Sequence, residues 1–316
     1  MSIKKKGKSV KRAAKRKRPR SQKRKMSRPA KGKRATPAAQ STAYETSWRA
    51  ARDPERSDEE RINAFAALTN VVCDDPAVFK EMVEVLRDTK TSLAVRLAAL
   101  GALQAASFSA IKFNAFRPAY MAALRAIATD PEPELRQRAL GLLSREGDGR
   151  AQQLLLEGLK DPTKALVPPE KALQLLAYDV KGEAYPIARR IVERPPNTEA
   201  KLEALRLLAA DAKSARVFEK ILQDKKESTE VRQVAAAALQ ALAPESLQAY
   251  AREIVLDPTE SSDLQATSLT ALAHFGKRED LEKDDALSKR VDRLEATAET
   301  ESVRQSARQF TGKYRR

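Results

Sequence analysis

A single motif recurs along most of the chain and restricts the folds that it can adopt. Each copy is an alanine- and leucine-rich segment that follows a polar turn and usually carries a basic residue near its start. The clear copies span 91–106, 132–145, 168–179, 198–211, 228–242 and 261–275, and two weaker copies span 58–72 and 301–314. Alignment of the copies places at one equivalent position Arg61, Arg96, Arg136, Lys171, Lys201, Arg232, Gln265 and Arg304. Successive members of this set are 30 to 40 residues apart, a spacing typical of helical-repeat solenoids.

The spacing of apolar residues predicts that each copy is a helix. In 228–242 the apolar side chains recur at intervals of three and four residues, so they form one stripe. Further helices are expected between the copies, at 77–88, 115–128, 150–160, 183–193, 214–223, 245–256 and 283–296. Asp-Pro pairs mark turns at 53–54, 75–76, 130–131, 161–162 and 257–258. Because a helix with one apolar stripe cannot bury it alone, we expect an all-α fold, an α–α superhelix of about seven helical pairs with 58–72 as an N-terminal cap helix.

The positive charge of the chain is concentrated at its N-terminus. Residues 1–34 contain 18 Lys and Arg, whereas the rest of the chain has 42 basic and 43 acidic residues. Like charges at this density repel, and the segment has few bulky apolar residues, so we expect 1–42 to be a disordered polybasic tail with a spacer, followed by the solenoid over 43–316. The residues expected to bind a polyanion are Lys4, Lys5, Lys6, Lys8, Lys11, Arg12, Lys15, Arg16, Lys17, Arg18, Arg20, Lys23, Arg24, Lys25, Arg28, Lys31, Lys33 and Arg34.

The composition of the tail favours a partner whose phosphates are contacted without regard to sequence. Each Lys or Arg that neutralises a phosphate releases counterions, which gives salt-sensitive affinity. No aromatic residue lies in 1–42, so bases would have nothing to stack on. DNA, RNA, ribosomes and polyphosphate all fit, and anionic lipid fits less well because apolar anchors are missing. The alternative is a solubilising tail with no specific partner.

The body resembles the HEAT-repeat family, more closely the short-repeat type found in proteins similar to bilin lyases. The resemblance covers 57–316 and rests on an Asp in the turn followed by an Arg in an Ala/Leu-rich helix, as in Asp88 with Arg96, Asp130 with Arg136, and Asp224 with Arg232. It implies that these Asp and Arg residues form a ladder along the turns and that the Arg-bearing helices line the concave face. Gln265 replaces the basic residue, so the ladder is expected to break in the sixth pair.

The sequence offers no catalytic or metal-binding motif. A single histidine, His274, and a single cysteine, Cys73, exclude a His-rich zinc site and an internal disulfide. We expect His274 to cap or pack the end of its helix, and Cys73 to be a buried thiol whose pKa is raised by neighbouring carboxylates. The acid-rich stretch 279–285 lacks the spacing of a calcium loop and is expected to begin a helix. No cofactor is expected.

Two groups of aromatic residues are candidates for partner contacts. The longest interval between copies contains Phe108, Phe113, Phe116 and Tyr120. Most of these side chains are expected in a local core, with Phe113 and Phe116 as the alternative anchors for a partner. Tyr44 and Trp48 lie where the tail meets the solenoid, and they either pack on the first helix or contact the ligand of the tail.

These features favour a non-enzymatic adaptor, in which the solenoid binds a protein partner and the tail binds nucleic acid or another polyanion. One alternative is a HEAT solenoid that itself grips nucleic acid, which the near-neutral body disfavours. Another is an enzyme or chaperone like the bilin-lyase relatives, for which no catalytic constellation is present. We expect a monomer without a transmembrane segment, in the cytoplasm, or in the nucleus if the source is eukaryotic.

Overall fold

The computed structural model describes residues 37–314, with the side chains from Tyr44 onward, and these residues form helices joined by short turns. The residues from Tyr44 onward form one compact unit, which holds the helical body. The tail residues predicted to bind a polyanion, all within 1–34, lie outside the described residues. In the described part of the chain there is no β-strand, and no helix is long and apolar enough to cross a membrane. The prediction of an all-α solenoid is confirmed.

The helices of residues 37–314 form eight consecutive pairs. The first helices of the pairs are α1 (Pro37–Arg52), α3 (Pro76–Arg87), α6 (Arg117–Ile127), α8 (Gly149–Lys160), α10 (Ala184–Glu193), α12 (Ala215–Gln223), α14 (Pro244–Leu256) and α17 (Asp285–Thr297). The second helices are α2 (Asp58–Leu68), α4 (Leu93–Ser107), α7 (Pro133–Arg145), α9 (Pro169–Leu176), α11 (Thr198–Leu208), α13 (Thr229–Leu242), α15 (Ser262–Phe275) and α18 (Glu301–Tyr314). Short helices α5 (Ala110–Phe113), α16 (Arg278–Leu281), η1 (Pro162–Lys164) and η2 (Ala212–Ser214) lie in the longer connections.

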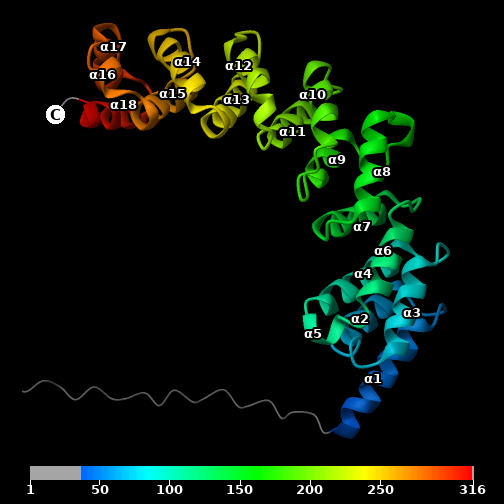
Figure 1. The fold of residues 1–316 in the computed structure, drawn as a ribbon. Coiled ribbons are helices and arrows are strands. Elements are labelled where there is room, and N and C mark those ends of the chain that lie inside the picture. Colours follow the sequence, from blue (N-terminus) through cyan, green and yellow to red (C-terminus); the bar gives the residue numbers. More distant parts are fainter. Residues whose placement is uncertain (1–36, 315–316) are drawn as a thin grey trace, which may run out of the picture. The chain divides into compact units, whose positions relative to one another are not determined.

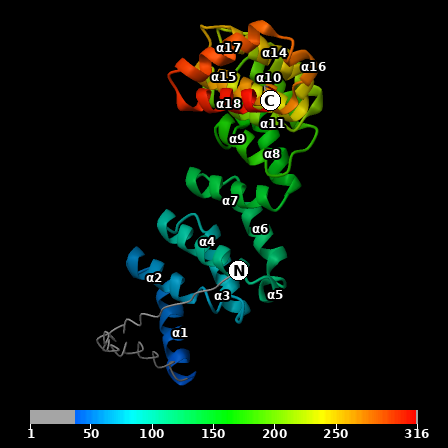
Figure 2. The ribbon, with the colours of Figure 1, turned by 90° about the vertical axis from the view of Figure 1, so that its left-hand side faces the viewer.

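From α3 onward each first helix packs against its partner, and each second helix packs against the second helix of the next pair. Among the first helices, α3 packs on α6, α8 on α10, α12 on α14 and α14 on α17. In the second half of the body, α10, α12, α14 and α17 lie on one side, and α11, α13, α15 and α18 lie on the other (Figure 1). The order of the helices along the chain is also their order in space (Figure 1), and a second view shows α2, α4, α7 and α9 following one another (Figure 2). The stripes predicted from the sequence face the resulting core, where Phe218, Val231 and Leu239 are at most 2% exposed. Burial of such side chains is the main favourable contribution to the stability of the stack.

Capping residues fix where the helices begin. Ser92, Asn197, Ser228 and Ser261 each accept a hydrogen bond from the third backbone N–H of a second helix. Ser57 and Glu60 form a complete capping box at the start of α2. These caps, together with the Asp-Pro turns, explain why the predicted helices agree with the observed bounds within a few residues.

The structure differs from the expectation at the N-terminal end. Residues 37–42 were expected to belong to the spacer, but helix α1 begins at Pro37. The segment 58–72 was expected as an N-terminal cap helix, and α2 packs on α4. It also contacts α1, since the Arg61 Nε atom donates to the Ala51 carbonyl over 3.3 Å. Arg96 makes the same bond to Leu86, and Arg232 makes it to Leu222. The first pair is therefore built like the later ones.

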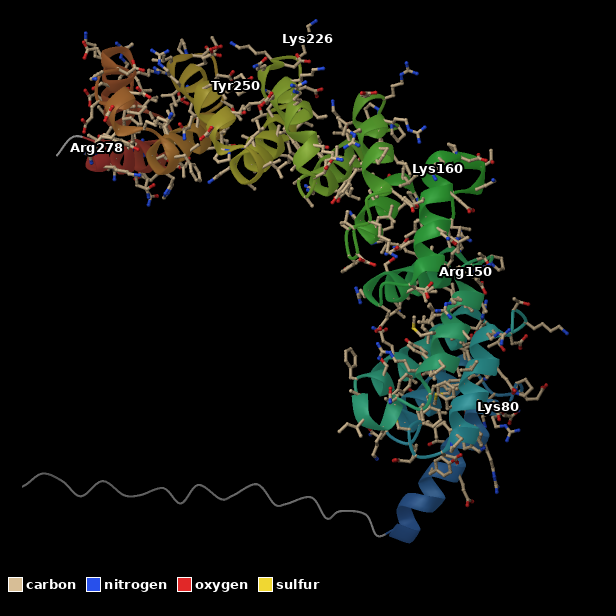
Figure 3. The ribbon with its side chains drawn as sticks, viewed as in Figure 1. Lys80, Arg150, Lys160, Lys226, Tyr250 and Arg278 are labelled. Carbon is tan, nitrogen blue, oxygen red and sulfur yellow. The ribbon has the colours of Figure 1, made fainter. Side chains whose placement is uncertain are left out.

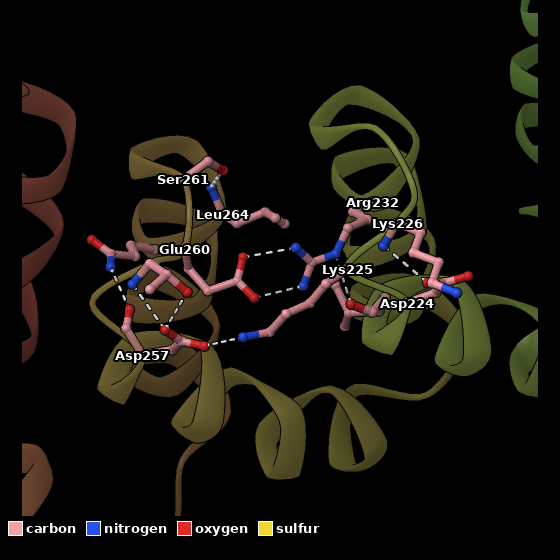
Figure 4. Close-up of polar contacts among 11 residues, drawn as sticks. Asp224, Lys225, Lys226, Arg232, Asp257, Glu260, Ser261 and Leu264 are labelled. Atoms are coloured by element: carbon pink, nitrogen blue, oxygen red, sulfur yellow. Dashed lines mark hydrogen bonds and ion pairs between the residues drawn. The ribbon is translucent and has the colours of Figure 1, made fainter.

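Buried arginines join consecutive pairs at one recurring place, which we call the ladder position: the fourth residue after the N-cap of each second helix. The guanidinium of Arg96 forms a bidentate pair with Asp130 of the next pair, and both residues are at most 6% exposed. Arg232 forms the equivalent bidentate pair with Glu260, at 2.7 and 2.8 Å (Figure 4). Lys201 makes a single contact with Glu227 at the equivalent place. Where such a contact is present, it links one turn to the following one.

The acidic partners in this ladder differ from those implied by the family resemblance. Asp88 and Asp224 do not pair with the arginines of their own repeats; instead, they accept hydrogen bonds from Lys90 N and Lys226 N and so close their own turns. Arg136 donates to the Leu166 carbonyl of the next pair and to the Asp130 carbonyl, without contacting the Asp130 carboxylate. Of these three aspartates, only Asp130 pairs with a ladder arginine, and that arginine is Arg96 of the preceding repeat.

The predicted break at Gln265 is observed, and a second break lies at α9. Gln265 donates only to the Asp257 carbonyl within its own repeat. The N-cap of α9 is Pro168, and its carbonyl accepts a hydrogen bond from the backbone N–H of Ala172. Lys171, which was aligned with the arginines, is therefore one residue out of register, and the ladder position is occupied by a buried alanine.

A second series of contacts joins the first helices of consecutive pairs. In each, a side chain of one first helix reaches an acid at or near the start of the next first helix. The contacts are Tyr44 with Asp75 (2.6 Å), Arg125 with Asp148 (2.8 Å), Gln152 with Asp179 (2.8 Å), Arg189 with Asp211 (2.5 Å) and Arg252 with Asp284 (2.5 Å). Both helix layers are therefore held by polar contacts at their ends as well as by the apolar core.

The ladder arginine in α4 should be a large contributor to stability. We expect Arg96→Ala to lower the free energy of unfolding by about 3 to 5 kcal/mol, because it leaves the Asp130 carboxylate buried without its partner. Arg138→Ala is the matched control, since Arg138 forms an exposed pair with Glu134 and should contribute only about 0.2 to 1 kcal/mol. Urea unfolding followed by circular dichroism measures both, and equal losses would contradict the assignment.

Candidate binding surfaces

A groove crosses the second helices α4, α7 and α9, with a volume of 520 Å³. It is lined by side chains from three consecutive pairs, and none of the lining residues is acidic. They are Gln104, Gln137, Arg138, Gly141, Leu142, Arg145, Lys171, Gln174, Leu175 and Tyr178. The groove thus combines cations and amide groups with an exposed aromatic ring, and of these residues arginine and tyrosine are enriched in protein interfaces.

Local packing shapes the floor and the end of this groove. A Cβ atom added to Gly141 would meet only the Leu175 side chain, at 3.8 Å, so the missing side chain keeps the floor hollow. At one end the guanidinium of Arg145 lies 5.5 Å from the centre of the Tyr178 ring. Tyr178 is 55% exposed, one of the few large hydrophobic side chains on the surface of residues 44–314. Sequence reasoning missed it, because its position after the last turn of α9 follows no pattern.

The charges in the groove are only partly neutralised by neighbours. Arg138 pairs with Glu134 at 2.7 Å on its own helix. The Gln174 amide donates to Glu203 of the next second helix over 3.2 Å and accepts from Lys171 over 3.4 Å. An acidic segment of a partner could replace these exposed contacts at small cost, since such surface pairs contribute little.

Tyr44 and Trp48 pack at the N-terminal end of the body. Their rings stack at 6.5 Å, and the Arg52 guanidinium lies 5.5 Å from the centre of the Trp48 ring. The Tyr44 hydroxyl donates to Asp75 over 2.6 Å, and burial together with this carboxylate raises the pKa of Tyr44 to about 12. The same bond, with backbone N–H donors, lowers the pKa of Asp75. Both aromatic residues are half-buried, so they anchor α1 on the first pairs.

The aromatic segment 108–120 divides into a buried and an exposed part. Phe113 is 1% exposed and packs edge-on against Tyr120 and Phe79, so it is core and not a partner contact. Phe116 lies half-buried against Phe79, with ring centres 4.7 Å apart. Phe108 and Ile111 are instead 82% and 94% exposed. The helical period of the short helix α5 separates the inward Phe113 from the outward Ile111.

The remaining residues considered in the sequence analysis are Cys73, His274 and the acid-rich stretch 279–285. Cys73 is half-buried with its Sγ atom 3.7 Å from the Ala106 carbonyl, and burial, followed by Asp74, raises the pKa of the thiol. His274 is exposed in the last turn of α15 beside the Phe275 ring. In the acid-rich stretch, Asp284 caps α17 and pairs with Arg252. Among residues 37–314, no three His, Cys, Asp or Glu side chains are placed to hold a metal ion.

The first helices expose a different set of charges. Lys80 of α3 and Arg150 and Lys160 of α8 extend from the body on the first-helix side (Figure 3). None of these residues lines the groove. The charge of these residues can therefore be changed in control variants without altering the groove.

The bond between Tyr44 and Asp75 predicts a pH-dependent change at this end of the body. The folded pKa of Asp75 is depressed, so its contribution to stability is complete above the unfolded value and is lost as the pH falls through the folded value. Tyr44→Phe should raise the folded pKa and move the acid transition of Trp48 fluorescence to higher pH. Trp48 is the single tryptophan of the chain, so the signal is local. Tyr178→Phe should leave the transition in place, and the same shift in both variants would contradict the prediction.

No protein-family model matches the chain, and no curated protein sequence is significantly similar to it. Among solved structures, a crystal structure of importin beta matches 88% of this chain at 14% identity with a TM-score of 0.46, and the match spans 42% of the importin beta chain. A designed armadillo repeat protein matches 85% of this chain at 17% identity with a TM-score of 0.25. Human deoxyhypusine hydroxylase matches 78% at 16% identity with a TM-score of 0.32.

These similarities concern the fold alone, and the repeat is visible in the molecule itself. Eight helical pairs follow one another in residues 37–314, with a recurring ladder position on the second helices and a recurring contact between the first helices. The body of this chain is an α-solenoid of HEAT-like helical pairs.

Proposed function

We propose that the chain is a non-enzymatic adaptor: the solenoid binds an acidic segment of a protein partner in the groove across α4, α7 and α9, and the basic tail binds nucleic acid or another polyanion. The observation that carries the first half is the lining of the groove, in which Arg138, Arg145 and Lys171 face no carboxylate among the other lining residues. Arginine and tyrosine are enriched among the residues that dominate binding energy, and Arg145 with Tyr178 supplies both.

The distribution of charge supports the second half. The tail has 18 basic residues and no acid, whereas the remainder of the chain is nearly neutral. A neutral body does not compete with an external polyanion for the tail through long-range attraction. Binding of two partners by one chain would raise the apparent affinity of each complex for the other, because the connection sets an effective concentration. A cytoplasmic or, in a eukaryote, nuclear location belongs to this proposal.

Removal of the tail should abolish polyanion binding and preserve the solenoid. We expect deletion of 1–36, which leaves α1 whole, to eliminate salt-sensitive binding to duplex DNA and to polyphosphate, while helical circular dichroism is retained. A full-length variant in which all 18 tail Lys and Arg are replaced by Gln is the matched control for chain length. Fluorescence anisotropy over a range of salt concentrations measures the effect. Undiminished binding by the deleted form would refute the role of the tail.

Changes in the groove should weaken binding of the protein partner. We expect Arg145→Glu or Tyr178→Ala to reduce the affinity at least about tenfold, as is usual for central interface residues. The measurement is calorimetry with a purified protein captured by the full-length chain after nuclease treatment. Arg150→Glu on α8 is the control, because this exposed arginine lies outside the groove. Equal affinities of all three variants would rule out the groove.

The same groove favours a second candidate, a solenoid that itself binds nucleic acid. Its cations could contact phosphates, and Tyr178 could stack on an unpaired base. The deletion of 1–36 distinguishes the two: retained binding of single-stranded nucleic acid that is lost on Arg145→Glu would favour this candidate over the adaptor.

A further inference from the structure

A second cavity lies where the ladder is interrupted. It has a volume of 380 Å³ and is enclosed by α8, the turn 161–168, the start of α9 and the end of α10. Its lining is apolar except for Arg194, and the lining residues include Gly158, Ala165, Leu166, Ala172 and Pro196. The volume is at the lower end of the range for sites that bind small ligands or a few side chains.

The equivalent hollow between the pairs α12/α13 and α14/α15 contains ion pairs that are absent from this cavity. That hollow, of 360 Å³, is lined by Arg232, Glu260, Lys225 and Asp257, which form two ion pairs across it (Figure 4). In the apolar cavity, Ala172 stands at the ladder position. The acid that precedes the N-cap in the later turns, Glu227 or Glu260, is replaced by Pro196. Both partners of the ion pair are therefore missing together.

The walls of this cavity are held in place without a ligand. Pro168, the N-cap of α9, follows the C-cap Asp161 by seven positions, whereas Ser92 follows Asp88 by four, so the turn is longer here. A Cβ atom on Gly158 would lie 2.9 Å from the Ala165 Cα atom, so the turn rests directly on α8. Asp161 closes the turn by accepting from Thr163, and Arg136 of the previous pair donates to the Leu166 carbonyl over 2.6 Å. A preformed site loses little entropy when it is filled.

Arg194 gives the cavity its chemical preference. It is exposed at the C-terminal end of α10, lines the cavity, and has no ion pair or side-chain hydrogen bond among residues 44–314. A guanidinium beside an apolar pocket matches a bulky apolar group with an adjoining carboxylate. The polybasic tail of this chain does not fit, because it has no acid and its charge would oppose that of Arg194.

We propose that this cavity binds a peptide segment of a protein partner in which a bulky apolar side chain adjoins an acidic residue. The apolar side chain enters between α8 and the turn 161–168, and the carboxylate pairs with Arg194. The bound peptide segment would thus connect the two neighbouring helical pairs, as the ion pair between Arg232 and Glu260 does elsewhere in the solenoid. This site adds a second peptide contact to the adaptor and rests on that proposed role, but it shares no lining residue with the groove.

The test uses a double variant that restores the ladder ion pair, so that an arginine and a glutamate side chain of the protein itself occupy the cavity. Random twelve-residue peptides displayed on phage are selected on the full-length protein and counter-selected on Ala172→Arg/Pro196→Glu. Selected sequences should pair Leu, Ile or Phe with Asp or Glu. Synthetic copies should bind the unaltered chain at least tenfold more tightly than the double variant. Circular dichroism and thermal unfolding establish that the variant is folded.

Single substitutions of exposed residues test the same proposal if the double variant does not fold. Arg194→Glu should weaken the peptides at least tenfold, and Arg190→Glu, one turn earlier on α10 and outside the cavity, should change the affinity less than twofold. The proposal is overturned if no peptide is selected, if the peptides ignore Arg194→Glu, or if 4-phenylbutyrate binds more tightly than any peptide. Tyr178→Ala should leave these peptides unaffected, so failure of the groove and failure of the cavity are separable.

Discussion

The bidentate ion pair between an arginine of one helical pair and a carboxylate of the next determines how the repeats of α4 and α7, and those of α13 and α15, lie against each other. An arginine that is 1% exposed, such as Arg96, is stable only if its donors are satisfied, and they are satisfied only when the following turn brings Asp130 into place. Burial raises the pKa of Asp130, but the hydrogen bonds from Arg96 and from the Glu132 N–H, together with the charge of Arg96, outweigh it and leave the pKa lowered. The apolar stripes favour contact between helices, whereas this pair fixes which turn lies beside which.

The same requirement explains how the ladder can vary without loss of the fold. Where an acid is absent, Arg136 uses the Leu166 carbonyl of the next pair, and Gln265 uses a carbonyl of its own repeat. Where the arginine is absent, the position is a small apolar residue, Ala172, and no buried donor is left unpaired. Each variant satisfies the hydrogen-bonding groups that it buries, so the stack tolerates all three.

The helices could be predicted from the sequence because the spacing of apolar residues, the N-cap residues and the turn residues are all signals within a few neighbouring positions. Asp-Pro turns and Ser caps place the helix ends, and the stripes of α12 and α13 are visible in the printed residues. The pairing of Arg96 with Asp130 could not be predicted, because 34 positions separate them and a nearer Asp is present at 88. The register of α9 was misjudged for a related reason: Lys171 is basic, but the longer turn before it moves the ladder position to Ala172.

The candidate sites were harder to predict than the fold. Phe113 and Ile111 are both large and apolar, and only the orientation of a four-residue helix decides that one is core and the other surface. The groove and the cavity are each assembled from turns and helix faces of different repeats, none of which is distinctive alone. A hollow of this kind is visible only when the neighbouring pair is in place.

The groove has a geometric consequence for whatever lies in it. It takes one glutamine from each of three successive second helices, Gln104, Gln137 and Gln174, and helices that pack side by side are about 8 to 10 Å apart. An extended polypeptide advances about 3.3 Å per residue, so a strand laid across the helices would pass one amide about every third residue. The solenoid would in this way measure the spacing of side chains along its partner, with the distance between its own repeats as the unit.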